Sequence, residues 1–370
     1  MEARSRVGPC PAVATAPRVR LRVRPGRLRD HALRCRAALG RETWLEGSAV
    51  CEPSISGRPA RRNVRAHIRT IRVSVRGARP LGTVPEEAMM PSRPASAPEV
   101  KTLLTGLAMG ESPRWHEGRL WFSDWGAQEI VAADLDGSSE VVIRTSFGLP
   151  FCIDWLPDGR LLIVSGRDNL LLRREPDGSL VPHADLRRLS DKVWNEIVVD
   201  GRGNVYVNGG PGIIALVRPD GSARQVADGI AFPNGMAVTP DNATLIIADS
   251  HGKRLTAFDI AADGSLSNQR VWADLGGGVP DGICIDADKA VWYGDVPNKR
   301  CVRVHEGGQV LQTIQLDRGC FACMLGGTDN RTLFMIVAEW RGMQHIPDVA
   351  RARTGQVLTA EAPAPGVGWP

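Results

Sequence analysis

The fold is decided by the stretch Val279-Pro280-Asp281-Gly282-Ile283-Cys284-Ile285-Asp286, because a related stretch occurs earlier in the chain. This earlier stretch is Phe232-Pro233-Asn234-Gly235-Met236-Ala237-Val238. In both, a small side chain that carries oxygen lies between Pro and Gly, directly before an apolar run. In both, a turn then leads into a second apolar strand. Two strands joined in this way form part of a repeated unit.

The second strand of this unit recurs six times, at intervals of 41, 44, 40, 46 and 42 residues. Its copies are Arg119-Leu-Trp-Phe-Ser, Arg160-Leu-Leu-Ile-Val, Asn204-Val-Tyr-Val-Asn, Thr244-Leu-Ile-Ile-Ala, Ala290-Val-Trp-Tyr-Gly and Thr332-Leu-Phe-Met-Ile. Turn pairs in phase with them predict a hairpin of two further strands: Asp136-Gly137, Asp177-Gly178, Asp220-Gly221, Asp263-Gly264 and Gly307-Gly308. A period of about 40–45 residues with four strands is typical of a β-propeller blade.

The repeat therefore predicts an all-β protein, a six-bladed β-propeller over residues 99–370. The strands nearest the axis are continuous apolar runs, as expected where both faces are covered. The last unit has a third strand at residues 356–361 but no fourth. Because Val100-Lys-Thr-Leu-Leu resembles the missing outer strand, we expect both ends of the domain to meet in blade six and pair the open edge.

The first part of the chain has a different composition from the repeats. Residues 1–90 hold 19 Arg, no Lys and 7 acidic residues, so the basic character of the chain is confined to them. Such a segment either binds an anionic surface or nucleic acid, directs the chain to an organelle, or has no function. We expect the last: a disordered extension over residues 1–95, upstream of a natural start at Met89 or Met90.

Several classes of protein do not fit this sequence. It contains no run of 18 apolar residues, so no membrane span is expected. Its eight Cys lack the spacing of a disulfide framework, which favours a reduced, cytoplasmic protein. The pair Cys320 and Cys323 has no second pair beside it, which favours packing over zinc or redox chemistry. We expect no nucleic-acid partner for the propeller, and the sequence indicates no oligomeric state.

Four side chains that carry oxygen share one position in the repeat. Counting back from the second strands, each lies seven to nine residues earlier: Glu111, Asn195, Asn234 and Asp281. The corresponding segments of blades two and six, Pro150–Cys152 and Phe321–Cys323, are apolar. Since the loop into each innermost strand lies at one end of the propeller channel, we expect the four to converge there. The alternative is that they are ordinary turn residues.

A ring of oxygen donors without His or Cys favours a hard divalent cation. Ca²⁺ is the ion we expect, with Zn²⁺, Mn²⁺ and Mg²⁺ as alternatives. Two carboxylates would balance its charge, and two amide oxygens would add neutral donors.

Several motifs resemble the gluconolactonase/senescence marker protein (regucalcin) family, which includes luciferin-regenerating enzymes. They are Gly110-Glu111-Ser-Pro-Arg-Trp115, Phe232-Pro-Asn234-Gly235-Met236, Ala248-Asp249-Ser250, Pro280-Asp281-Gly282-Ile-Cys-Ile-Asp286 and Cys320-Phe-Ala-Cys-Met-Leu-Gly-Gly327. The resemblance covers residues 99–370. It implies lactone hydrolysis at a metal held by Glu111, Asn234 and Asp281. It also implies that Asp281 is the general base and that Asn195 contacts substrate or metal.

One position departs from the family pattern. Sugar-lactone hydrolases of the family often carry Arg two residues before the residue matching Asn195, whereas this chain has Val193, followed by Trp194. We therefore expect a more apolar lactone or ester as the small-molecule substrate. A phosphotriesterase-like hydrolase, or a binding scaffold with a structural metal, are the alternatives. Carboxylates converging on the channel favour the hydrolase, since a scaffold needs none there.

Overall fold

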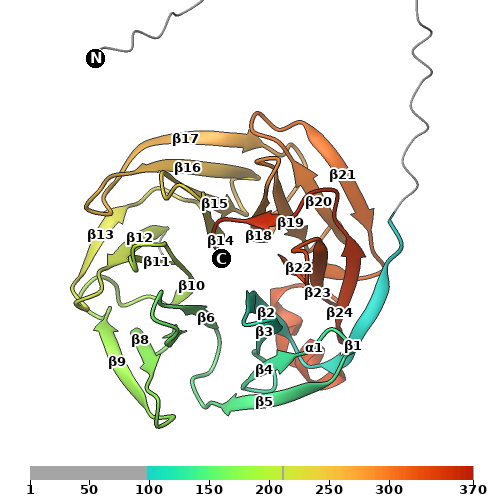
Figure 1. The fold of residues 1–370 in the computed structure, drawn as a ribbon, viewed down its shortest axis with the longest axis horizontal. Coiled ribbons are helices and arrows are strands. Elements are labelled where there is room, and N and C mark those ends of the chain that lie inside the picture. The colour runs from blue at the N-terminus through green and yellow to red at the C-terminus, as the bar shows by residue number, and fades with distance from the viewer. Residues whose placement is uncertain (1–97, 211, 370) are drawn as a thin grey trace, which may run out of the picture. The chain divides into compact units, whose positions relative to one another are not determined.

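The computed structural model describes residues 98–210 and 212–369. Within them, six antiparallel sheets of at least four strands are arranged as blades around a central axis (Figure 1). This confirms the prediction of an all-β, six-bladed propeller. The extension predicted over residues 1–95 lies outside the described residues.

The two inner strands of each blade are the ones that the sequence repeat identifies. The innermost strands of blades one to six are β2 (Gly110–His116), β6 (Phe151–Trp155), β10 (Trp194–Val199), β14 (Pro233–Val238), β18 (Pro280–Asp286) and β22 (Gly319–Gly326). The second strands are β3 (Arg119–Asp124), β7 (Leu161–Ser165), β11 (Val205–Gly209), β15 (Thr244–Asp249), β19 (Val291–Asp295) and β23 (Thr332–Ala338). They are mostly buried, because neighbouring blades cover both of their faces.

The two outer strands follow in the same order. The third strands are β4 (Glu129–Ala133), β8 (Leu170–Arg174), β12 (Ile213–Val217), β16 (Arg254–Ile260), β20 (Arg300–Val304) and β24 (Gly355–Glu361). The outermost are β5 (Ser139–Arg144), β9 (Leu180–Asp185), β13 (Ala223–Ala227), β17 (Leu266–Asp274) and β21 (Val310–Gln315), with β1 (Lys101–Leu107) in blade six. Exposed side chains are concentrated on these outermost strands.

The turn between the third and outermost strands follows from local chemistry. In the first of them, Asp136 Oδ1 accepts a hydrogen bond of 2.8 Å from the Ser138 backbone N–H. Gly137 between them has φ 87°, a left-handed conformation that other residues rarely adopt. Aspartate followed by glycine therefore reverses the chain within a few residues.

Blade six joins the two ends of the domain, as the sequence predicts. Strand β1 pairs with β24 in antiparallel register, with Lys101 opposite Thr359 and Leu107 opposite Gly355. The connection from β23 to β24 contains a short 3₁₀ helix, η1 (Met343–His345), and the helix α1 (Ile346–Ala352). This connection lies at the end of the channel where the innermost strands begin.

The last described residues form contacts that the sequence does not indicate. Strand β25 (Gly366–Val367) pairs with Ile285 and Asp286 of β18. Trp369 then exchanges two backbone hydrogen bonds with Val238, of 2.6 and 2.9 Å. A cavity of about 430 Å³ lies at this end of the channel, where the innermost strands end, and Trp369 is part of its lining.

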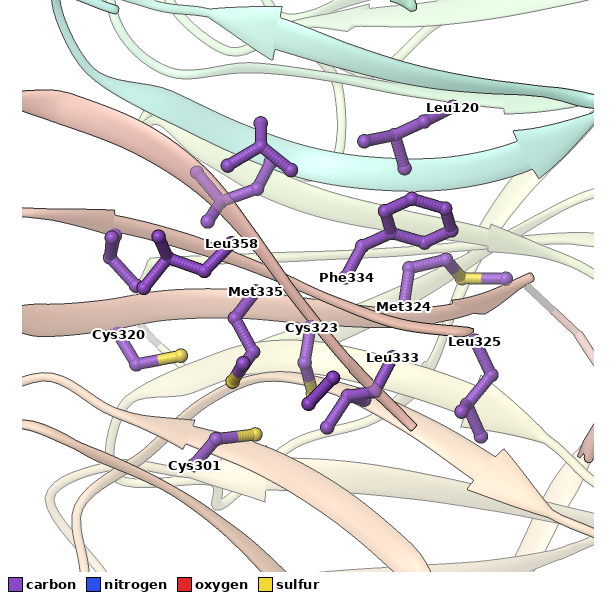
Figure 2. Packing of buried hydrophobic residues seen from close by; sticks show 14 of the residues in the cluster. Leu120, Cys301, Cys320, Cys323, Met324, Leu325, Leu333, Phe334, Met335 and Leu358 are labelled. Atoms are coloured by element: carbon purple, nitrogen blue, oxygen red, sulfur yellow. The ribbon is translucent and has the colours of Figure 1, made fainter. Parts of the chain in front are cut away.

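Buried side chains fill the space between neighbouring blades. Figure 2 shows Cys301, Cys320, Cys323 and Met335 within one such cluster. The Cys284 and Cys323 sulfur atoms lie 4.0 Å apart, and burial raises the pKa of both thiols well above the ordinary value. This environment agrees with a packing role for Cys320 and Cys323. No helix in the described part of the chain is long and apolar enough to cross a membrane.

Candidate active site

The four predicted oxygen ligands are second residues of innermost strands, rather than parts of the preceding loops as predicted. The first residue of each strand already pairs with the second strand: Gly110 with Asp124, Trp194 with Gly209, Pro233 with Asp249 and Pro280 with Asp295. Proline is tolerated at the first position of a strand, so pairing begins earlier than the Pro-rich sequence indicates. Glu111, Asn195, Asn234 and Asp281 thus occupy one level at the same end of the channel; we call them the oxygen ring.

A β-bulge accompanies every member of the oxygen ring. The pairing register of the innermost strand shifts between Glu111 and Arg114 in blade one. It shifts at the corresponding place in blades three, four and five. Of the two blades that contribute no oxygen ligand, blade two has no such shift, whereas blade six has one between Cys320 and Ala322. Since a bulge redirects the side chains beside it, all four members of the oxygen ring lie beside a redirected segment, but the bulge alone does not distinguish them from Cys320.

Contacts between neighbouring blades bring the oxygen ring together. The Asn195 amide donates to Asn234 Oδ1 at 3.5 Å and to the Pro233 carbonyl oxygen at 3.4 Å. The Asn234 amide donates to Ser250 Oγ at 3.4 Å, and the Ser250 hydroxyl donates to the carbonyl oxygen of Pro280, directly before Asp281, at 2.6 Å. The Glu111 and Asp281 carboxylates are close enough to perturb one another's ionisation. The structure therefore brings all four predicted residues into one group.

The two carboxylates are placed where their charged forms are unfavourable without a cation. Burial raises the pKa of Glu111 well above its ordinary value of 4.5, and repulsion from Asp281 and Glu196 raises it further. Burial and repulsion from Glu196 likewise raise the pKa of Asp281 well above 3.8, although the hydrogen bond from Asn234 favours its ionised form. A positive charge among these groups would reverse both shifts.

Glu196, which sequence reasoning missed, is a third carboxylate beside the oxygen ring. Its Oε1 accepts hydrogen bonds from Arg114 Nη2 and Ser112 Oγ, both at 3.2 Å, and from the Ile197 backbone N–H at 2.9 Å. Arg114 also lies 3.6 Å from Asp154 Oδ2, and all three charged side chains are buried. Arg114 is thus shared by Glu196 and Asp154, and among the described residues neither Glu111 nor Asp281 forms an ion pair with Lys, Arg or His.

Three buried aspartates, also missed, hold the strand starts that carry Glu111, Asn234 and Asp281. Each accepts a hydrogen bond from the backbone N–H two residues before the ligand. Asp124 accepts from Met109 at 2.8 Å, Asp249 from Phe232 at 3.0 Å and Asp295 from Val279 at 3.3 Å. We call them the anchor aspartates; their exposed fractions are 1%, 0% and 0%.

The other three blades lack an anchor aspartate. The paired positions hold Ser165 in blade two, Gly209 in blade three and Ala338 in blade six. At Gly209 a Cβ atom would lie 2.7 Å from the Val193 carbonyl oxygen, so no side chain fits. The positions equivalent to the oxygen ring in blades two and six are Cys152 and Cys320, both in the hydrophobic core. In blade six this position lies one residue before the segment Phe321–Cys323 that the sequence analysis gives as the equivalent.

The donor set fits a hard cation in its chemistry. Two carboxylates and two amide oxygens converge, and neither His nor Cys belongs to the group. Within residues 98–210 and 212–369 there is no cluster of three or more His, Cys, Asp or Glu arranged to hold a metal. The fit therefore rests on amide donors together with Glu111 and Asp281.

Two characterised relatives are similar in sequence. Regucalcin of Xenopus laevis is 27% identical over 264 residues, which cover 64% of this chain and 87% of the relative. The 6-deoxy-6-sulfogluconolactonase of Pseudomonas putida is 30% identical over 162 residues, which cover 42% of this chain and 55% of the relative.

Solved structures share the fold. A luciferin-regenerating enzyme superposes with a TM-score of 0.62 and 19% identity, covering 73% of this chain and 98% of its own. The calcium-binding protein regucalcin of Agrobacterium tumefaciens strain C58 superposes with a TM-score of 0.59 and 20% identity, covering 74% and 97%. The family profile described as SMP-30/Gluconolactonase/LRE-like region matches residues 109–339. This chain therefore belongs to the SMP-30/gluconolactonase/luciferin-regenerating enzyme family.

Proposed function

We propose that this protein hydrolyses a lactone, or a closely related ester, at the oxygen ring. The observation that carries the proposal is the convergence of Glu111 and Asp281 with two side-chain amides at one end of the channel. Membership in a family that includes gluconolactonases supports the reaction class. The similarity to a 6-deoxy-6-sulfogluconolactonase supports a lactone as the substrate.

The same proposal includes a divalent cation held by Glu111, Asn234 and Asp281, with Asn195 at or beside it. Ca²⁺ is the first candidate, because the donors are all oxygen and a calcium-binding protein shares the fold. Raised pKa values at Glu111 and Asp281 support it, since a nearby positive charge would favour the ionised forms of a buried and a partly buried carboxylate that lie side by side. Zn²⁺, Mn²⁺ and Mg²⁺ are the alternatives to test.

The residues of the oxygen ring divide the work of hydrolysis. A divalent cation bound there would polarise the substrate carbonyl and lower the pKa of water. Asp281 accepts a proton from the attacking water, whose oxygen adds to the carbonyl carbon. The ring C–O bond then breaks, and Asp281 returns its proton to the departing oxygen to give the hydroxy acid and restore the carboxylate. The Asn195 amide orients the substrate by donating a hydrogen bond.

A pH-stat screen tests this proposal directly. Lactones, aryl esters and phosphotriesters are offered to the protein with Ca²⁺, Mn²⁺, Zn²⁺, Mg²⁺ or a chelator. We expect acid release from lactones that requires a divalent cation. Turnover of phosphotriesters alone would move the protein to a phosphotriesterase-like function. No turnover of any substrate with any cation would favour a binding scaffold and contradict the proposal.

A further inference from the structure

The residues that precede the oxygen ring at its end of the channel have hydrocarbon side chains. Two positions before each ligand, toward the open end of the channel, the chain carries Met109, Val193, Phe232 and Val279. Val193 and Phe232 are 45% and 38% exposed, although large apolar side chains are usually covered. Met109 is buried and Val279 is partly buried. A substrate that reaches the oxygen ring from this end therefore passes these apolar residues, which we call the collar.

Aromatic side chains extend this collar over blades three and four. The Phe232 and His251 rings lie 4.6 Å apart at an angle of 36°. His251 follows β15, whose last residue pairs with Pro233, so it lies at the same end of the channel. Together with Val193, this pair forms one wall.

A second wall lies over blades six and one. Trp340 meets Phe321 edge to face, with ring centroids 5.7 Å apart. Trp125 donates from its indole N–H to the Phe151 carbonyl oxygen at 2.5 Å, and both tryptophans are only partly buried. They pack against a cluster that contains Met109, Phe321 and Val349 of helix α1.

The two walls face one another across the channel. Figure 1 shows β10 and β14 on one side of the axis and β22 and β2 on the other. Apolar side chains therefore lie on two opposite sides of the axis at the end of the channel that holds the oxygen ring, and we call this pair of walls the slot. The Arg318 side chain, which precedes blade six, is engaged by the Asp317 carboxylate and the Thr354 carbonyl oxygen. It is therefore not free to receive the hydroxyl groups of a sugar.

We propose that the substrate is a lactone or ester with a hydrocarbon substituent, alkyl or aryl, that lies between these walls. The inference rests on the proposed function. The hydrocarbon side chains of the slot offer no hydrogen bonds to the hydroxyl groups of a sugar lactone, which would lose water against them, and each such loss is unfavourable. A hydrocarbon substituent instead leaves water for apolar surface, which is favourable. The slot thus selects a different substrate class from the sulfogluconolactone of the Pseudomonas putida relative's name.

A series of δ-lactones tests this inference. δ-Valerolactone, its alkyl-substituted homologues and D-glucono-1,5-lactone are compared by kcat/KM with a saturating cation. Each methylene that the slot covers should raise kcat/KM about 4-fold, which corresponds to about 0.8 kcal/mol. Gluconolactone should be at least about 10-fold poorer than the best alkyl lactone. A preference for gluconolactone would overturn the inference while leaving lactone hydrolysis intact.

Two matched variants locate the effect. Val193→Ser should lower kcat/KM most for the longest alkyl lactones and so remove most of the chain-length dependence. Val271→Ser is the control, because Val271 is 54% exposed on the outermost strand β17, away from the channel. Equal effects of the two substitutions would contradict the slot.

A binding measurement makes the inference independent of turnover. Lactams, which resist hydrolysis, are tested by thermal shift with Ca²⁺ present: a series of alkyl δ-lactams against D-gluconolactam. We expect stabilisation that grows with alkyl length and disappears in Val193→Ser. If no lactone is hydrolysed but this pattern holds, the proposed reaction is wrong and the apolar ligand class stands. If gluconolactam stabilises the protein more than the alkyl lactams, the inference fails.

Discussion

Blades one, four and five differ from blades two, three and six in how the start of the innermost strand is held. In the first three, a buried anchor aspartate fixes the backbone two residues before Glu111, Asn234 or Asp281. In the others, Ser165, Gly209 and Ala338 take the place of that aspartate. The anchored residues are the three that family resemblance implies as metal ligands. The blade chemistry thus separates strand starts that a buried carboxylate holds from strand starts that have no such carboxylate.

Asn195 is the informative exception, because it belongs to the oxygen ring without an anchor. Its side chain is held mainly by the neighbouring blade, through Asn234 and the Pro233 carbonyl. A side chain held in this way can exchange those bonds for bonds to a substrate. The comparison therefore supports the proposal that Asn195 orients substrate and that the anchored three hold the cation, a division that experiments can test.

Loss of the proposed base should produce the largest effect. Asp281→Asn keeps the size and one oxygen donor but removes the proton acceptor. We expect turnover to fall on the order of 10²–10⁴-fold with cation saturating, the usual range for loss of a general base. Single-turnover rates at several cation concentrations separate this from weakened cation binding. Asp329→Asn, at an exposed turn beyond the other end of the inner strands, is the matched control and should change nothing.

An unchanged rate in Asp281→Asn would limit Asp281 to holding the cation. The general base would then have to be sought among the unanchored blades or at Glu196. That outcome would reverse the functional assignment of blade five.

Removal of the cation should destabilise the anchored blades selectively. A ligand at 100 times its dissociation constant stabilises the native state by about 2.7 kcal/mol. Chelation should therefore lower the melting temperature, and Ca²⁺ should restore it. Hydrogen exchange should accelerate at the Met109, Phe232 and Val279 amides, but not at the starts of blades two and six. Unchanged melting and exchange would make the oxygen ring a polar packing feature.

The destabilisation caused by chelation should grow with pH. Without a cation, the pKa values of Glu111 and Asp281 are raised above those of the unfolded chain, so the folded protein binds more protons. The contribution of these two groups to stability is then highest at low pH and falls as pH rises above about 4.5 through the raised values. A bound cation keeps both groups ionised and removes this loss. Melting curves between pH 4.5 and 8, with and without Ca²⁺, measure the difference; parallel curves would contradict it.

Replacement of an anchor should weaken cation binding without removing a ligand. Asp295→Asn keeps the shape but removes the charge from a fully buried acceptor. Loss of such supporting groups typically lowers metal affinity about 10–100-fold. We expect this in calorimetric titration with Ca²⁺, and a similar result for Asp249→Asn. Ser165→Ala, at the equivalent place in an unanchored blade, should leave the affinity unchanged; an equal loss there would abolish the distinction between the two sets of blades.

The fold and the oxygen ring were predictable because repetition makes weak signals add. A single Asn or Asp before Gly indicates only a turn, whereas Glu111, Asn195, Asn234 and Asp281 recur seven to nine residues before four of the six aligned strands. The closure of blade six by residues 101–107 followed from a missing fourth strand. The pairing of β25 with β18 did not, because two residues within a Pro- and Gly-rich end carry no strand pattern.

Glu196 and the anchor aspartates could not be predicted from strand alternation alone. Alternation places Asn195 and Glu196 on opposite faces, but the bulge after Trp194 changes the direction of both. The anchor aspartates reach the backbone of the innermost strand only because of the register in which the two inner strands pair, and the sequence alone does not give that register. A signal for them did exist: Asp124, Asp249 and Asp295 each lie five residues after the start of an aligned second strand. Their burial and bonds become apparent only once the strands are paired.

The smallest effect is expected at Asn195, and it tests the exception in the comparison. Asn195→Ala removes an amide that contacts Asn234 and Pro233 but leaves the three anchored residues unchanged. A single neutral hydrogen bond contributes about 0.5–1.5 kcal/mol, so we expect a several-fold rise in KM with a smaller change in kcat. Calcium affinity measured by calorimetry should stay within about 3-fold of the unsubstituted protein. A loss of affinity as large as that in Asp295→Asn would place Asn195 among the cation ligands, and anchoring would then no longer distinguish ligands from substrate contacts.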